Sequence, residues 1–199
     1  MQRPLKVSYP PLAPWDHRLT DIGCASLHPV QTLHENAWFA VRNRGGYYTV
    51  EHHLPYVIVL PVVNQLSILL VRVKRPILDD ISLELPGGAV ERGEAPEEGA
   101  ARELAEETGI AVNDVRRFIP MPPLSLSPGR TPKLAYVFRV ELTQQEYDVR
   151  NPHDDEVTDV ACVSLPEVAR MITDGSIYVS VPVAVIGMYL VATYGLARL

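Results

Sequence analysis

The chain has 199 residues, of which 47% are hydrophobic and 21% charged, a composition typical of one globular domain with an additional element rather than of a disordered chain. Its formal net charge of -6 argues against the broad basic surface that nucleic acids require. Two cysteines far apart, Cys24 and Cys162, indicate neither a disulfide framework nor a zinc site, so we expect a protein of the reducing cytoplasm.

The first half of the chain is predicted to form strands. Residues 1–14 contain several prolines and no apolar run of signal-peptide length, which argues against secretion. Beyond them, stretches rich in β-branched and aromatic residues are separated by turn signals at Gly45-Gly46 and Asn64-Gln65. The predicted strands are 38–41, 47–51, 56–63 and 67–73. We expect residues 1–50 to form an N-terminal antiparallel β arm and residues 51–199 to form the main domain.

Residues 96–108 are predicted to form a helix, because apolar and small residues recur there at spacings of three and four. Pro96 suits the first helical position and Gly109 can close the C-terminus. Gly99 in the interior and Ala95 at the N-cap are both unfavourable. Packing or a ligand must therefore stabilise this helix.

The second half is predicted to mix loops, strands and helices. The expected elements are a proline-rich loop at 120–132, strands at 134–142 and 158–163, an acidic loop at 151–156, and helices at 165–173 and 181–199. The last helix approaches the length of a membrane span, but Pro182 and Gly187 interrupt it, so we interpret it as a buried helix. The mixed order favours an α/β fold, namely an α/β/α sandwich with a mixed sheet and the N-terminal antiparallel β arm.

The segment from Leu85 to Ile110 joins a glycine-rich turn to an acidic helix. Glu103, Glu106 and Glu107 stand at i, i+3 and i+4, so their carboxylates project from neighbouring positions and repel one another. Hard oxygen donors in such a cluster suit Mg²⁺ or Mn²⁺, and glycines in the turn let a backbone carbonyl approach the same ion. An isolated cluster of this kind is more often a solvated helix face, and the surrounding segment decides between these interpretations.

The whole segment resembles the Nudix box, G-x5-E-x7-R-E-U-x-E-E-x-G-U, in which U is a bulky aliphatic residue. The matching residues are Gly88, Glu94, Arg102, Glu103, Leu104, Glu106, Glu107, Gly109 and Ile110. The resemblance implies a Nudix fold and the metal-dependent hydrolysis of a diphosphate bonded to another group. It also implies that Glu103 and Glu107 are the principal metal ligands, that Glu106 assists them, and that Gly87 offers its carbonyl. Arg102 is implied to orient a box glutamate.

Residues 32–189 are similar to the ADP-ribose pyrophosphatase and nucleotide-sugar branch of that family. The similarity implies substrate-binding roles for six residues: Arg75 before the loop at 76–82, Glu84, Trp38, Gly88, Pro128 and Gly129. It implies that Glu156 is the general base or an extra metal ligand. The alternatives are a core or interface role for Trp38, a surface ion pair for Arg75 or Glu84, and a solvated loop around Glu156.

The predicted reaction is the hydrolysis of ADP-ribose to AMP and ribose 5-phosphate. GDP-mannose or another nucleotide sugar is an alternative substrate, since the box recognises the diphosphate rather than the base. A Nudix-fold sensor that binds its ligand without turnover is an alternative of a different class, against which the intact set of Glu103, Glu106 and Glu107 argues. The predicted partners are a small nucleoside diphosphate derivative and a second copy of the chain, with no nucleic acid and no membrane. Exposed strand edges in the arm, together with the resemblance, favour the homodimer.

Overall fold

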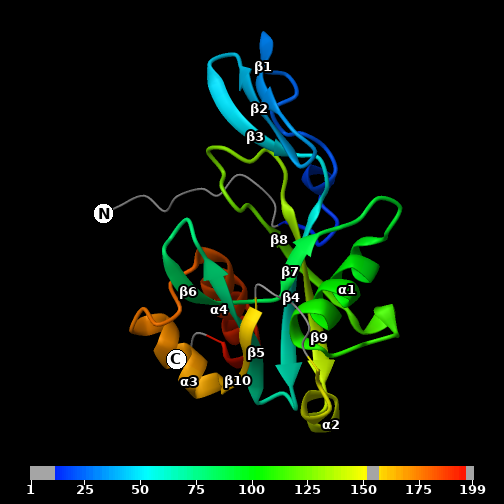
Figure 1. Ribbon diagram of the computed structural model, residues 1–199, viewed down its shortest axis with the longest axis vertical. Coiled ribbons are helices and arrows are strands. Elements are labelled where there is room, and N and C mark those ends of the chain that lie inside the picture. The colour runs from blue at the N-terminus through cyan, green and yellow to red at the C-terminus, as the bar shows by residue number, and fades with distance from the viewer. Residues whose placement is uncertain (1–11, 152–156, 196–199) are drawn as a thin grey trace.

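A computed structural model describes residues 12–151 and 157–195 and divides their strands between two sheets (Figure 1). The strands β1 (Val30–Glu35), β2 (Phe39–Arg44) and β3 (Tyr47–His52) form a three-stranded antiparallel arm at one end of the molecule. The predicted antiparallel arm is confirmed, and it begins earlier than the first predicted strand. Every residue of β1 is exposed, so this strand shows no apolar alternation in the sequence. The division of the chain at residues 50 and 51 stays a prediction.

The larger sheet is mixed. Its main path runs β10-β5-β4-β9-β8, and β4 pairs antiparallel with β5 but parallel with β9. Two further short strands, β6 and β7, pair with β5 and β4. The bounds are β4 Tyr56–Val63, β5 Ser67–Arg75, β6 Asp80–Glu84, β7 Gly87–Ala89, β8 Ile119–Leu124, β9 Ala135–Leu142 and β10 Val157–Ser164.

Helices cover both faces of this sheet (Figure 1). Successive residues of β4 alternate between two buried clusters, because neighbouring side chains of a strand point to opposite faces. Val57 and Val59 pack with residues of α1, whereas Ile58 and Leu60 pack with residues of α3 and α4. The predicted α/β/α sandwich with a mixed sheet is therefore confirmed. The helices are η1 His17–Leu19, α1 Pro96–Thr108, η2 Val115–Arg117, α2 Gln144–Asp148, α3 Leu165–Thr173 and α4 Ser180–Tyr194.

The helix α1 has the predicted bounds, with Pro96 in its first turn and Gly109 at its C-cap. Gly109 has φ of 71°, in the left-handed region that favours glycine, and its N–H donates to the carbonyl oxygen of Ala105. At the other end, Ala95 has no side chain that could cap the helix. Instead, the N–H of Ala95 donates to the Glu98 carboxylate over 2.8 Å, which supplies part of the missing cap.

Helix α4 packs against the sheet, as interpreted from the sequence. Its residues Val185, Ile186, Tyr189 and Leu190 belong to the buried cluster on the face opposite α1. Within residues 12–151 and 157–195, no helix combines the length and apolarity needed to cross a bilayer.

The predictions of two loops are wrong in part, because both segments contain residues of strands. The loop expected at 120–132 begins inside β8, which lies at the edge of the sheet, where prolines are tolerated. The loop expected at 76–82 contains the start of β6, which pairs with β5 from Asp80 onward. The helix α2 was not predicted either.

Candidate active site

The glycine-rich turn and the acidic helix meet where Glu103 lies over Gly88. Gly88 belongs to β7, which pairs with the central strand β4, and Glu103 lies in α1. A Cβ atom on residue 88 would stand 2.4 Å from Oε1 of Glu103, closer than nonbonded atoms approach. The lack of a side chain at Gly88 therefore makes room for this carboxylate.

Gly87 is held tightly against β4. A Cβ atom on this residue would lie 2.3 Å from the carbonyl oxygen of Val57, so a larger residue would have to displace backbone. The carbonyl oxygen of Gly87 accepts a hydrogen bond of 3.1 Å from the hydroxyl of Tyr56. The carbonyl predicted to bind metal is thus placed by both β4 and Tyr56.

Arg102 binds three glutamates together. Its guanidinium donates to Glu94 over 3.1 and 3.2 Å, and to Glu103 and Glu106 over 2.9 Å each. It also donates to the carbonyl oxygen of Ala89 over 2.7 Å. A planar fork of five N–H donors suits this task, which a lysine could not perform. The predicted role of Arg102, orienting a box glutamate, agrees with these contacts and stays a prediction.

Burial and Arg102 act in opposite senses on the carboxylates. Burial raises the pKa of Glu103, and the hydrogen bond from Arg102 offsets only part of this effect. Burial also acts to raise the pKa of Glu94, but hydrogen bonds from Arg102 and from the backbone N–H of Glu91 outweigh it, so this pKa lies below its usual value. A partly desolvated Glu103 beside the negative charge of Glu106 is a setting that an added cation would stabilise.

Tyr56 stands beside the acidic cluster, although its position in the sequence marks it only as the first residue of a strand. Burial raises the pKa of its phenol to about 12, and the negative charge of Glu107 adds to this effect. Arg75 acts on the phenol in the opposite sense, while Glu103 and Glu84 act in the same sense as burial. Charged residues of β5, β6 and α1 thus act together on Tyr56 at the start of β4. A protonated hydroxyl at neutral pH can donate a hydrogen bond.

Arg75 and Glu84 form a bidentate ion pair across the β5–β6 hairpin. The guanidinium of Arg75 donates to the two carboxylate oxygens over 2.7 and 2.9 Å, and the hydroxyl of Ser82 donates to Glu84 over 2.6 Å. Burial acts to raise the pKa of Glu84, but these bonds outweigh it and leave the pKa below its usual value. The ion pair that is the alternative interpretation of both residues is present. Because the Arg75 side chain is 40% exposed, it also remains accessible, and its phosphate-binding role stays a prediction.

The donors fit a divalent cation in their chemistry. Glu103, Glu107 and the Gly87 carbonyl offer the hard oxygens that Mg²⁺ and Mn²⁺ prefer. In the part of the chain that the structure describes, no three histidine, cysteine, aspartate or glutamate side chains converge on a preformed metal-binding group. Mg²⁺ is commonly held by one or two protein carboxylates together with water and substrate phosphates. The residues present fit that mode rather than a closed protein cage.

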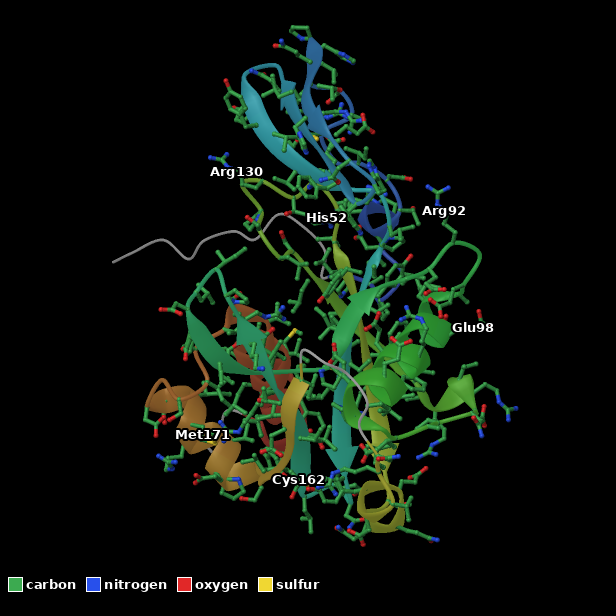
Figure 2. The ribbon with its side chains drawn as sticks, in the orientation of Figure 1. His52, Arg92, Glu98, Arg130, Cys162 and Met171 are labelled. Atoms are coloured by element: carbon green, nitrogen blue, oxygen red, sulfur yellow. The ribbon has the colours of Figure 1, made fainter. Side chains whose placement is uncertain are left out.

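A pocket of about 450 Å³ adjoins these groups at the base of the arm. Its walls include Arg42, Glu51, His52, Tyr56 and Lys133. Figure 2 shows His52 toward the base of the arm, above the sheet. Pockets of this volume accommodate small ligands. Tyr56 is both a wall of this pocket and the hydrogen-bond donor to the candidate metal ligand, so the two regions are contiguous.

The loop between β8 and β9, residues 125–134, forms one wall of the pocket and is hydrogen-bonded to the N-terminal part of the chain. The N–H of Val50 in β3 donates to the carbonyl oxygen of Arg130 over 2.9 Å. The N–H of Leu134 donates to the carbonyl oxygen of Arg18, in η1, over 3.0 Å. The arm and the segment before it therefore set the position of this wall.

None of the predicted site residues that the structure describes lines this pocket, and Trp38, Pro128 and Gly129 lie outside its wall like the others. The Trp38 side chain is 73% exposed, and the carbonyl of this residue accepts a hydrogen bond from the N–H of His53, which does line the pocket. Pro128 and Gly129 are exposed in the turn just before the pocket-lining residues. Glu156 lies outside the described residues, so its predicted role stays a prediction.

The model of the NUDIX domain family matches residues 52–179. Curated relatives include the ADP-ribose pyrophosphatase of Bacillus subtilis (strain 168), which is 30% identical over 63% of this chain and 66% of its own length. A methanol dehydrogenase activator of Bacillus methanolicus is 27% identical over 65% of this chain and 68% of its own length. The phosphatase NudJ of Shigella boydii serotype 4 (strain Sb227) is 38% identical over 43% of this chain and 53% of its own length.

Among solved structures, that of an ADP compounds hydrolase superposes with a TM-score of 0.63. It covers 85% of this chain and 96% of its own chain at 18% sequence identity. At an identity this low, the superposition shows a common fold alone. The curated matches span from about half to about two thirds of the relatives' lengths.

Proposed function

The chain belongs to the Nudix family, whose domain model matches residues 52–179, and we propose that it hydrolyses the pyrophosphate bond of a nucleoside diphosphate sugar with a divalent metal ion. The proposed substrate is ADP-ribose, and the proposed products are AMP and ribose 5-phosphate. The observation that carries the proposal is the position of the Glu103 carboxylate, which lies against Gly88 and accepts a hydrogen bond from Arg102.

The described residues divide the proposed work between two regions. Glu103, Glu107 and the Gly87 carbonyl would hold Mg²⁺ or Mn²⁺, which when bound neutralises charge on the pyrophosphate and lowers the pKa of a bound water. Arg102 orients Glu103 and Glu106 for this task. Water contributes its oxygen to one phosphorus and the bridging P–O bond breaks. Both products are phosphate monoesters with a second pKa of about 6, so most of the two protons of the water pass to the solvent at neutral pH.

The pocket at the base of the arm would receive the nucleoside half of the substrate. Its volume of about 450 Å³ suits a group of that size, and its wall includes Tyr56, next to the carboxylates. Arg75, at the end of β5, would bind a phosphate oxygen through the exposed part of its guanidinium. The names of the Bacillus subtilis ADP-ribose pyrophosphatase and of the ADP compounds hydrolase support an ADP-linked substrate.

We further propose a homodimer built on the arm. Every residue of β1 is exposed, and Trp38, Tyr47 and Tyr48 are large exposed side chains of the arm. Strand edges and aromatic side chains of this kind are suited to covering by a second copy. Sedimentation of the intact chain and of Trp38→Ala would test this proposal, since a monomeric wild type would contradict it.

The proposed activity is tested by phosphate-product release with Mg²⁺ from ADP-ribose, GDP-mannose, a dinucleoside polyphosphate and NADH. The variant Glu107→Gln removes one carboxylate charge from the cluster, and Glu97→Gln removes one from the first turn of the same helix as a matched control. We expect ADP-ribose to be the preferred substrate and Glu107→Gln to lower kcat at least about 100-fold, the scale for losing one group that stabilises developing charge. Glu97→Gln should retain activity.

Preferential turnover of GDP-mannose would contradict ADP-ribose as the substrate but would support the proposed class of reaction. Tight binding of ADP-ribose without turnover by the wild type would contradict hydrolysis and support a sensor.

A further inference from the structure

The hydroxyl of Tyr56 and the carbonyl of Gly87 join two segments that are far apart in the sequence. Tyr56 opens β4, and Gly87 opens β7, which pairs with β4 through Ile58. Along β4, Tyr56 and Ile58 lie two residues apart, so their side chains emerge from the same face of the strand. The Tyr56 hydroxyl reaches the Gly87 carbonyl over 3.1 Å.

We propose that Tyr56 is a positioning residue that holds the Gly87 carbonyl in the orientation in which it binds the divalent ion. The proposal rests on the proposed metal-dependent function of the same site. It assigns to Tyr56 no contact with the reacting atoms.

The strand β7 cannot obtain this orientation from a side chain of its own. A Cβ atom at residue 87 would meet the carbonyl oxygen of Val57 at 2.3 Å, and one at residue 88 would meet the Glu103 carboxylate at 2.4 Å. Both positions therefore need glycine, whose backbone is the most permissive of all residues. A hydrogen bond from a neighbouring strand supplies an orientation that these glycines cannot supply.

A carbonyl oxygen that accepts one hydrogen bond can still bind a cation. It carries two lone pairs, and the Tyr56 hydroxyl occupies one of them. Partners in the outer shell of a metal site fix its ligands in this way, and their loss costs about 10- to 100-fold in metal affinity or activity. If the hydroxyl instead competed with the ion for the carbonyl, its removal would strengthen metal binding. The sign of the change thus separates positioning from competition.

The ring of Tyr56 contributes to the pocket wall, whereas its hydroxyl donates the hydrogen bond to Gly87. The substitution Tyr56→Phe therefore keeps the ring and removes the hydrogen bond to Gly87. Tyr178→Phe is a matched control, because the hydroxyl of Tyr178 donates to the carboxylate of Asp80 over 2.6 Å, and neither residue contacts Gly87.

The test is the equilibrium binding of Mn²⁺ to the full chain without substrate, measured by electron paramagnetic resonance of the unbound ion. We expect Tyr56→Phe to raise the Kd for Mn²⁺ about tenfold and Tyr178→Phe to leave it unchanged, with both variants folded by thermal melting. A turnover assay should show the half-saturating Mn²⁺ concentration rising in Tyr56→Phe while kcat at saturating Mn²⁺ stays near that of the wild type.

An unchanged or lower Kd in Tyr56→Phe would overturn the proposal, and so would a wild type that binds no Mn²⁺. A rise of equal size in Tyr178→Phe would also overturn it, because the effect would then be general to loss of a tyrosine hydroxyl. If the wild type binds Mn²⁺ but hydrolyses none of the substrates, the proposed function fails while the binding comparison still decides the role of Tyr56.

Discussion

The carboxylate of Glu103 occupies the space in which a side chain at Gly88 would lie, with both oxygens within 2.5 Å of the position of a Cβ atom there. The backbone of the turn thereby restricts where the Glu103 carboxylate can point. Gly87, one residue earlier, faces backbone of β4 instead. Neighbouring glycines are consequently required for different reasons.

Gly88→Ala should separate metal binding from stability. The new Cβ would displace the flexible end of Glu103 rather than backbone, so we expect Mn²⁺ affinity to fall about 10- to 100-fold with little change in melting temperature. Gly87→Ala should destabilise the fold by about 1–3 kcal/mol, because backbone of β4 must move. Gly187→Ala in α4 adds a Cβ with no neighbouring atom within 4 Å and should be neutral or stabilising. Equal losses of stability in the first two variants, measured by denaturant unfolding, would contradict this account.

Removal of the metal should abolish activity without unfolding the chain. Arg102 already binds Glu94, Glu103 and Glu106, so the acidic cluster is held together before any ion arrives. With excess chelator we expect the far-ultraviolet circular dichroism to persist and the melting temperature to fall only by the mass-action contribution of the lost ion. Arg102→Met should make the chelated protein clearly less stable than the chelated wild type. Loss of helical signal when chelator is added to the wild type would show this expectation to be wrong.

Acid should weaken the arm through Glu51. This carboxylate is 4% exposed, and hydrogen bonds from Arg44, then Thr49 and Arg42, lower its pKa from 4.5 to about 2. Since the folded pKa lies below the unfolded one, the stabilisation is present above about pH 4.5 and is lost as the pH falls toward 2. The melting temperature of the wild type should therefore fall as the pH is lowered from about 4.5 toward 2.

Glu51→Gln should make the melting temperature less dependent on pH in this range. At neutral pH it should lower the free energy of unfolding by on the order of 3 kcal/mol, because it leaves the arginines without their buried counter-charge. Glu167→Gln removes a carboxylate from an exposed ion pair on α3 and should change neither measurement. An unchanged acid slope in Glu51→Gln would assign the acid sensitivity to other carboxylates.

Arg75→Gln should raise KM for ADP-ribose about tenfold or more, the size expected for losing a hydrogen bond to a charged group. The effect on kcat should be smaller, because the guanidinium at the end of β5 is proposed to bind substrate rather than to take part in the reaction. Arg170→Gln on α3 also removes an arginine from an ion pair and should leave KM unchanged. Steady-state kinetics over a range of ADP-ribose concentrations measures both parameters, and an unchanged KM in Arg75→Gln would leave the ion pair with Glu84 as a purely structural contact.

The elements with local signals could be predicted from the sequence. The helix α1 has its predicted bounds because Pro96 and Gly109 act within the segment itself, and β4 has its predicted bounds because it is apolar throughout. The sequence predicts no strand at β1 and predicts loops over parts of β6 and β8, because the pairing partners of these strands define them more than their own composition does. Strand formation of this kind depends on tertiary context.

The same distinction between local signals and tertiary context applies to the candidate site. Glu103, Glu106 and Arg102 could be predicted as site residues because they lie in a single contiguous segment. The structure brings them together, and their roles stay predictions. Tyr56 could not be predicted, because its hydrogen bond to Gly87 spans 31 residues and nothing local distinguishes this tyrosine from others at a strand end. For Trp38, Pro128 and Gly129 the sequence offered resemblance alone, and the structure leaves them beside the pocket rather than in its wall.

The hydrogen bonds between the pocket loop and the N-terminal part of the chain limit which segments can be exchanged in a chimeric protein. Val50 and Leu134 donate their backbone N–H groups to Arg130 and Arg18, so these bonds depend on the path of the main chain rather than on side-chain identity. A chimera that imports the loop from a relative without the segment from η1 through β3 would lose the match between these donors and their acceptors. The unit that can be exchanged to alter substrate range is therefore the loop together with the arm.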